Sequence, residues 1–232
     1  MLPSGGGWTI IPVMRCLVQN GLFTALAIVC LAVALGAMTA GCAASGAKGA
    51  GPTNVLACRL TNYGNFQDAA WTHLPSICIE HVLMSVPPPD QVETVKKRLA
   101  DHGLKAVVMR GQADLSQPSC IDELTVQLEA CRKMGGKYMF LSPKHPGVSK
   151  EVACRRLRRA GEIAKKHGVT IALETHPDLG TNGDIHLETM KQVNRPNIRV
   201  NFDAGNITYY NKNVNAPAEL EKIIDYVATV EL

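Results

Sequence analysis

The sequence predicts an α/β fold, a (β/α)8-type TIM barrel of which about seven strands are present. From Asn54 onward, short apolar runs alternate with longer amphipathic runs, and most apolar runs begin roughly thirty residues apart, the length of one βα unit. In addition, two neighbouring apolar runs, Ile171–Pro177 and Ile198–Asn206, end abruptly in acidic and imidazole or amide side chains. Parallel α/β barrels assemble metal and acid/base sites from such strand ends.

The composition is that of a globular protein. Of the 232 residues, 46% are hydrophobic and 19% are charged, which excludes a disordered chain. The net charge of +4 is spread along the helical segments, and aromatic residues make up only 5% of the chain. Without a basic patch interleaved with aromatic side chains, nucleic acid is not an expected partner.

The first 42 residues resemble an export signal rather than part of the barrel. Arg15 precedes an uncharged apolar run over 21–40, and small residues follow it. The exit Thr39-Ala-Gly-Cys42 resembles a bacterial lipoprotein cleavage box, although Thr39 stands where that box usually has Leu. An uncleaved membrane anchor is the alternative, since about twenty apolar residues can span a bilayer. We therefore expect a signal or lipoprotein-type segment (1–42), a small-residue linker (43–53) and a barrel (54–232) that is periplasmic or membrane-anchored.

The cysteines beyond Cys42 show no zinc-site spacing and no Cys-x-x-Cys pair. Most of them fall on apolar faces, so buried thiols are predicted, and one disulfide remains an open alternative. These cysteines are Cys58, Cys78, Cys120, Cys131 and Cys154.

The elements follow from apolar runs and from their start and stop residues. Strands are predicted at Val55–Leu60, Ile77–Met84, Lys105–Arg110, Tyr138–Ser142, Thr170–His176, Ile198–Asp203 and Tyr226–Leu232. Helices are predicted at Asp90–His102, Ser119–Met134, Ser149–His167, Asp184–Val193 and Ala216–Asp225. Ser149 is a typical N-cap, while Gly103, Gly135 and Gly168 are typical stops.

Seven strands are one fewer than a closed eight-stranded barrel needs. The last predicted strand reaches Leu232 without a following helix, which would leave two exposed sheet edges. We therefore expect a chain truncated before its eighth strand; a natural seven-stranded barrel is the alternative.

Alternation along the strands predicts which side chains enter the barrel mouth. Ile171 and Leu173 suit the helix-facing side of the fifth strand, which sends Glu174 inward. The same alternation turns Asp203 inward on the sixth strand and Glu231 inward on the seventh. Other polar groups are expected near these strand ends: Glu80 and His81, Arg110 and Gln112, and Lys144 and His145.

Each of these residues also has a plainer interpretation. Glu174 could be a loop carboxylate, and Asp203 could be an N-cap or turn residue before Ala-Gly-Asn. His176 suits substrate contact or loop packing equally well. His81, His145 and Lys144 are each typical of rim positions, and His73, His102, His167 and His186 are interpreted as structural.

Two segments, Ala172–His176 and Val200–Asn206, resemble the sugar phosphate isomerase/epimerase superfamily, whose xylose isomerase-like TIM barrels include the endonuclease IV type. Tyr209–Asn211 extends the resemblance. It implies that Glu174 and Asp203 bind a divalent metal, with Glu231 at the third ligand position, where His is common. Asn206 stands where many members have His. The fourth ligand of the family, a Glu on the eighth strand, has no counterpart here.

The resemblance implies a metal-dependent sugar or sugar phosphate isomerase or epimerase that acts through an enediolate, with Mg²⁺ or Mn²⁺ as cofactor. Glu174 would be catalytic. Substrate would be bound by His176, Asn206, Lys144, His145 and Arg110, the cations suiting a phosphate or carboxylate group. The alternatives are an anchored, non-catalytic sugar-binding barrel and an endonuclease IV-like phosphodiesterase.

Overall fold

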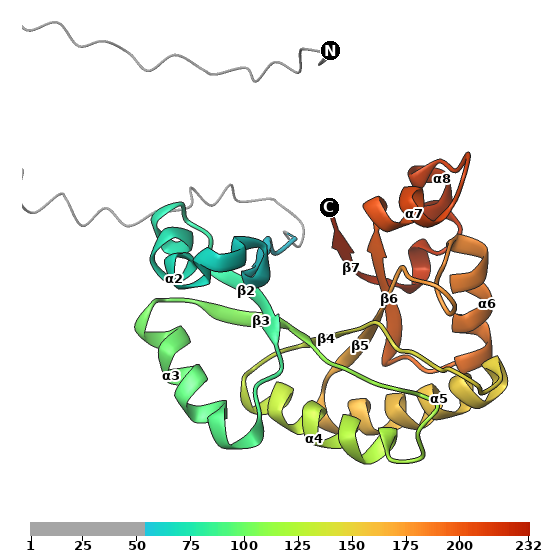
Figure 1. Ribbon diagram of the computed structural model, residues 1–232, viewed down its shortest axis with the longest axis horizontal. Coiled ribbons are helices and arrows are strands. Elements are labelled where there is room, and N and C mark those ends of the chain that lie inside the picture. Colours follow the sequence, from blue (N-terminus) through green and yellow to red (C-terminus); the bar gives the residue numbers. More distant parts are fainter. Residues whose placement is uncertain (1–53) are drawn as a thin grey trace, which may run out of the picture. The chain divides into compact units, whose positions relative to one another are not determined.

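The computed structural model describes residues 54–232, and within them the chain forms a half-barrel of seven parallel strands (Figure 1). The strands lie in the sheet in sequence order, each paired in parallel with the next. Their bounds are β1 (Ala57–Arg59), β2 (His81–Ser85), β3 (Lys105–Arg110), β4 (Tyr138–Leu141), β5 (Thr170–Glu174), β6 (Ile198–Asp203) and β7 (Val227–Glu231). The prediction of an incomplete TIM barrel is confirmed.

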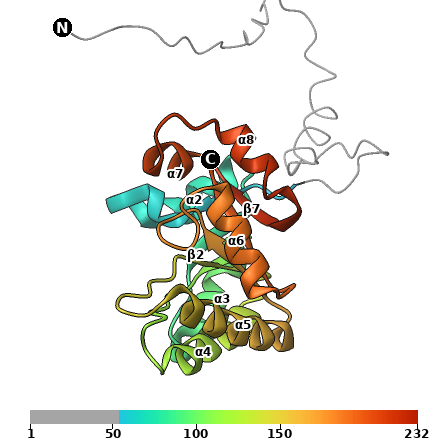
Figure 2. The same ribbon diagram turned by 90° about the vertical axis from the view of Figure 1, so that its right-hand side faces the viewer.

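Over residues 54–232, seven α-helices and three 3-10 helices connect the strands. The α-helices are α2 (Gln67–Ser76), α3 (Val92–Asp101), α4 (Cys120–Lys133), α5 (Lys150–His167), α6 (Gly183–Val193), α7 (Ala204–Tyr210) and α8 (Ala216–Glu221). The 3-10 helices are η1 (Leu60–Phe66), η2 (Pro89–Gln91) and η3 (Ile224–Tyr226). Helices α3 to α6 cover the outer side of the sheet (Figure 1), and α4 and α5 lie side by side in both views (Figure 2).

The main core lies between the sheet and these outer helices. Alternate residues of each central strand point into it, as the period of a strand requires. On β5 these are Ile171 and Leu173, which pack in one cluster with Leu157 of α5 and Val193 of α6. The opposite strand face, carrying Ala172 and its counterparts, is turned to the inside of the half-barrel. Because the two faces are separated in this way, Glu174 follows Ala172 onto the inner face.

Local signals fix the ends of the helices around the site. Asn182 caps α6 by accepting a hydrogen bond from the Ile185 N–H at 3.0 Å. Helix α5 begins after Ser149, as predicted, and ends at Gly168, whose φ of +66° is a left-handed conformation that glycine adopts without strain.

The structure corrects the predicted start of the second strand. Residues 77–79 form the C-terminal cap of α2, a helix that was not predicted: the Ile77 N–H donates to His73 O and the Ile79 N–H to Leu74 O. Strand β2 therefore begins at His81. Glu80 and His81 lie at its amino end, so the expectation that they follow the strand near the site was wrong.

Smaller differences arise where short elements meet. Strand β1 is three residues long rather than six, because Leu60 already starts η1. The predicted helix Ala216–Asp225 is divided into α8 and η3. Helix α7, which begins directly after β6, was not predicted as a helix.

Among residues 54–232, no helix is long and apolar enough to cross a membrane. The predicted export signal and the linker, 1–53, lie outside the residues that the structure describes.

Candidate functional site

Three carboxylates meet at the carboxyl ends of the last three strands. Glu174, Asp203 and Glu231 are the final residues of β5, β6 and β7, respectively. One oxygen atom from each lies within 4.8 Å of the others, and all three residues are half-buried. Parallel strands in register carry their C-terminal residues to one edge of a sheet, and Asp203 is paired directly with Glu231. The structure thus brings together the three residues for which metal ligation was predicted.

Arg59, the last residue of β1, is a fourth member of the site and was not predicted from the sequence. Its Nη2 lies 2.7 and 2.8 Å from the two carboxylate oxygens of Glu231. The guanidinium also lies over the ring of Phe140, 5.2 Å from its centroid, and its Nε is buried without a partner among the described residues. A basic residue near the carboxyl end of a short apolar strand was the signal that could have identified it.

Opposing effects act on the acidity of Glu231. Burial raises the pKa of this carboxyl, the nearby charge of Arg59 lowers it, and the charges of Asp203 and Glu174 raise it again. The net effect is a raised pKa, as expected where carboxylates share one site.

Asp203 is both the N-cap of α7 and a member of the carboxylate cluster, two positions that the sequence had offered as alternatives. Its Oδ1 accepts the N–H of Asn206 at 2.8 Å and so caps the first turn of α7. The same side chain belongs to the carboxylate cluster. Asn206 in turn donates from Nδ2 to Oε1 of Glu174 at 3.3 Å, so it links two members of the cluster.

His176 lies beside an aromatic side chain close to the carboxylates. Its ring and that of Tyr210 are edge to face with centroids 5.1 Å apart, and its Nδ1 is 2.8 Å from Pro177 O. The pKa of Tyr210 is raised by burial and by the charges of Glu174, Tyr209 and Asp203. The Tyr210 hydroxyl therefore stays protonated and available as a donor at neutral pH.

The three remaining predicted substrate-binding residues make no hydrogen bond or ion pair with the carboxylates in the described part of the chain. Arg110 and Lys144 are exposed. His145 is half-buried, with Nδ1 3.2 Å from Val148 O and Nε2 3.7 Å from the Asp178 carboxylate. A rim position was the plainer interpretation of Lys144 and His145, and substrate binding by all three residues stays a prediction.

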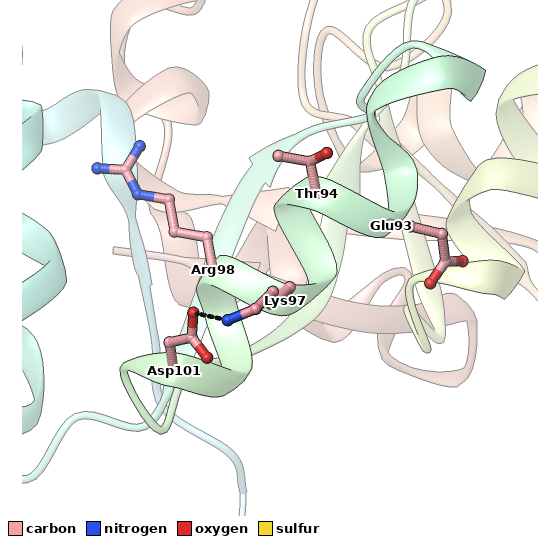
Figure 3. Close-up of a pocket in the computed structure, with 5 residues that line it drawn as sticks. All are labelled: Glu93, Thr94, Lys97, Arg98 and Asp101. Carbon is pink, nitrogen blue, oxygen red and sulfur yellow. Dashed lines mark hydrogen bonds and ion pairs between the residues drawn. The ribbon is translucent and has the colours of Figure 1, made fainter.

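A surface hollow elsewhere is unrelated to this site. It is lined by Glu93, Thr94, Lys97, Arg98 and Asp101, all on α3, and contains the Lys97–Asp101 ion pair at 2.6 Å (Figure 3). Alone among these features, the cluster at the ends of β5 to β7 combines several convergent carboxylates, and its all-oxygen donor set suits a hard divalent cation such as Mg²⁺ or Mn²⁺.

Solved structures with the same architecture are known. A xylose isomerase domain protein from Planctomyces limnophilus is 20% identical with a TM-score of 0.58; the match covers 67% of this chain and 64% of that one. A xylose isomerase-like TIM barrel protein from Mycobacterium smegmatis, in complex with magnesium, is 15% identical with a TM-score of 0.65, covering 78% and 74%. D-psicose 3-epimerase from Clostridium cellulolyticum, with D-tagatose, is 12% identical with a TM-score of 0.61, covering 75% and 71%.

The chain therefore spans less than two thirds of the Planctomyces protein, and at these identities the likeness shows the fold. No curated protein matches the chain. A family model described as xylose isomerase-like TIM barrel matches residues 77–231. Since that match covers most of the sequence and agrees with the parallel half-barrel, this chain belongs to the xylose isomerase-like TIM barrel family.

Proposed function

We propose that this protein is a metal-dependent sugar or sugar phosphate isomerase or epimerase that acts through an enediolate. The observation that carries the proposal is the convergence of Glu174, Asp203 and Glu231 within 4.8 Å at the carboxyl ends of adjacent parallel strands. In (β/α)8 enzymes this end of the strands is the catalytic face.

The charges of the site support a divalent cation. Three carboxyl groups meet a single guanidinium, that of Arg59, so the site has an excess of acidic groups that a bound divalent ion would balance. Glu174, Asp203 and Glu231 would hold the ion, with Arg59 retaining one oxygen of Glu231. A Mg²⁺ or Mn²⁺ ion bound there supplies Lewis acidity toward a sugar carbonyl and its neighbouring hydroxyl.

Glu174 is the group best placed to move a proton. Asn206 holds its Oε1 from one side, which orients the carboxylate and leaves the other oxygen for a substrate carbon-bound proton. His176 and Tyr210 form an adjacent wall whose polar atoms can bind sugar hydroxyls. The relatives crystallised with D-tagatose and D-allulose support a small sugar as the substrate class.

Two measurements test the proposal on the full chain. Titration calorimetry should detect one Mn²⁺ per chain, and incubation with ketoses should reveal interconversion with an aldose or a C3 epimer. Glu174→Gln should abolish turnover while the fold survives. Glu93→Gln, which removes an exposed carboxylate from α3, is the matched control and should change neither result. Failure of the wild-type chain to bind Mn²⁺ or Mg²⁺ would refute the metal site.

The alternative functions make different demands. A phosphodiesterase of the endonuclease IV type needs several zinc-binding imidazoles, whereas the cluster found in residues 54–232 consists of carboxylates alone. A non-catalytic sugar-binding barrel would bind sugar but turn over none, in the wild type as in Glu174→Gln.

We also propose export, from the apolar segment over 21–40 and the Cys42 exit. Cell fractionation tests this directly. Labelling with a radioactive fatty acid in the wild type, and its loss in Cys42→Ser, would distinguish a lipoprotein from a cleaved signal or an anchor.

A further inference from the structure

A single buried hydroxyl connects the strands that carry Glu174 and Asp203. Thr175 follows Glu174 directly and is fully buried. Its Oγ1 lies 3.1 Å from the Asp203 main-chain N, 3.2 Å from the main-chain O of Asn201 and 3.3 Å from Nε2 of His186 in α6. The end of β5, the end of β6 and helix α6 therefore share one oxygen atom.

The chemistry of the three neighbours fixes the direction of each hydrogen bond. A threonine hydroxyl has one proton to donate and two lone pairs to accept with. The carbonyl of Asn201 can only accept, so it takes the hydroxyl proton. The N–H of Asp203 can only donate, so it occupies one lone pair. His186 must then donate to the second lone pair, so its Nε2 carries a proton. In the neutral ring this is the Nε2–H tautomer.

The environment of His186 is consistent with that tautomer. The side chain is fully buried in α6, and burial lowers its pKa to about 4, so the ring is neutral at physiological pH. Its Nδ1 is also buried and finds no partner among residues 54–232. The imidazole thus has one polar contact within the described residues, and that contact is Thr175.

The loop after β5 is shaped around this ring. A Cβ added at Gly180 would lie 2.3 Å from Cε1 of His186 and 2.8 Å from the main-chain O of Glu174. Any side chain at position 180 would therefore push the imidazole or the strand end out of place. Thr189, also in α6, holds the same loop through a 2.7 Å bond to Leu179 O.

We propose that His186 is a positioning residue of the carboxylate site: it orients the Thr175 hydroxyl, which holds the main chain of Asp203 beside that of Glu174. The inference rests on the proposed metal-dependent function. His186 touches neither carboxylate, and it acts by keeping their strand ends at the separation that the cluster requires.

Conservative and disruptive pairs of variants test this role in the full chain. His186→Gln places an amide N–H donor near the position of Nε2, whereas His186→Leu removes the donor. Thr175→Ser keeps the hydroxyl, whereas Thr175→Val removes it at nearly constant shape. Thr189→Val is the matched control, since it removes a buried hydrogen bond from the same helix without touching Thr175.

The first readout is Mn²⁺ affinity, measured by calorimetry where each variant is fully folded. Loss of a residue that orients a metal ligand typically weakens binding about 10- to 100-fold. We expect His186→Leu and Thr175→Val to fall within that range. The Mn²⁺ affinity should stay within about threefold of the wild-type value in the other three variants, His186→Gln, Thr175→Ser and Thr189→Val. Equal affinities for His186→Leu and Thr189→Val would overturn the proposal.

The second readout needs no metal. Amide hydrogen exchange over residues 199–207 of the metal-free protein should become faster in His186→Leu and Thr175→Val, because the hydrogen bond from the Asp203 N–H to the Thr175 hydroxyl is weakened or lost. It should not become faster in Thr189→Val. If the wild type bound no Mn²⁺, the proposed function would fail and the exchange data would still decide the role of His186. Unchanged exchange in His186→Leu would refute that role.

Discussion

Acid should destabilise this fold through His186, and His186→Gln should remove that sensitivity. Burial lowers the pKa of His186 from its ordinary value of 6.5 to about 4. Above pH 6.5 the imidazole is neutral in both the folded and unfolded states, so it adds no pH dependence. As the pH falls below 6.5, the unfolded chain binds a proton that the folded protein does not, and the free energy of unfolding decreases.

The size of the effect follows from the two pKa values. Between 6.5 and about 4, each pH unit is worth about 1.4 kcal/mol, so the full loss is about 3 kcal/mol and is complete near the folded pKa. A typical domain has only about 5–15 kcal/mol of stability. One buried imidazole could therefore remove a large fraction of it.

Urea unfolding, followed by circular dichroism, measures this loss in the wild type and in His186→Gln from about pH 7 to about pH 4.5. Other titrating groups contribute equally to both proteins, so the difference between the two stabilities isolates His186. That difference should shift by about 2 to 3 kcal/mol in favour of the glutamine variant toward the acid end. A difference that stays constant with pH would refute the assignment of His186 as a buried neutral imidazole.

Three further outcomes follow from the structure. Arg59→Met should tighten Mn²⁺ binding several-fold in calorimetry, because the guanidinium competes for Glu231; weaker binding would show that Arg59 mainly orients that carboxylate. Gly180→Ala should lower the urea midpoint by an amount equivalent to about 1–3 kcal/mol, since its Cβ would meet the His186 ring at 2.3 Å. Cys131, whose pKa burial raises to about 12, should resist iodoacetamide at pH 8 until the protein unfolds; labelling in the folded protein would contradict this.

The central βα units could be predicted from the sequence because their apolar runs and their helix start and stop residues indicate the same elements. The runs from Lys105, Tyr138, Thr170 and Ile198 became strands that begin where predicted, and helices α5 and α6 end at the caps Gly168 and Asn194. The positions of Glu174 and Asp203 could be predicted because side chains alternate between the two faces of a strand. Once the apolar residues are assigned to the helix-facing side, the residues between them must point into the barrel.

The errors lie where an apolar run has two possible uses. Residues 77–79 look like the start of a strand, yet their N–H groups cap α2, a helix in which Trp71 and Leu74 are buried. Arg59 was missed for another reason. It is defined by a partner far along the chain, Glu231, and no local pattern specifies such a pairing.

The pairing of Arg59 with Glu231 joins the first and last strands of the half-barrel, residues that are 172 positions apart in the chain. The carboxylate cluster is therefore complete only after β7 has docked, and β7 is among the least buried of the strands. An ion held by Glu174, Asp203 and Glu231 would attach β7 more firmly to β5 and β6. Cation concentration would then govern how firmly the final strand is attached, so that exposure of β7 to proteases would report the occupancy of the site.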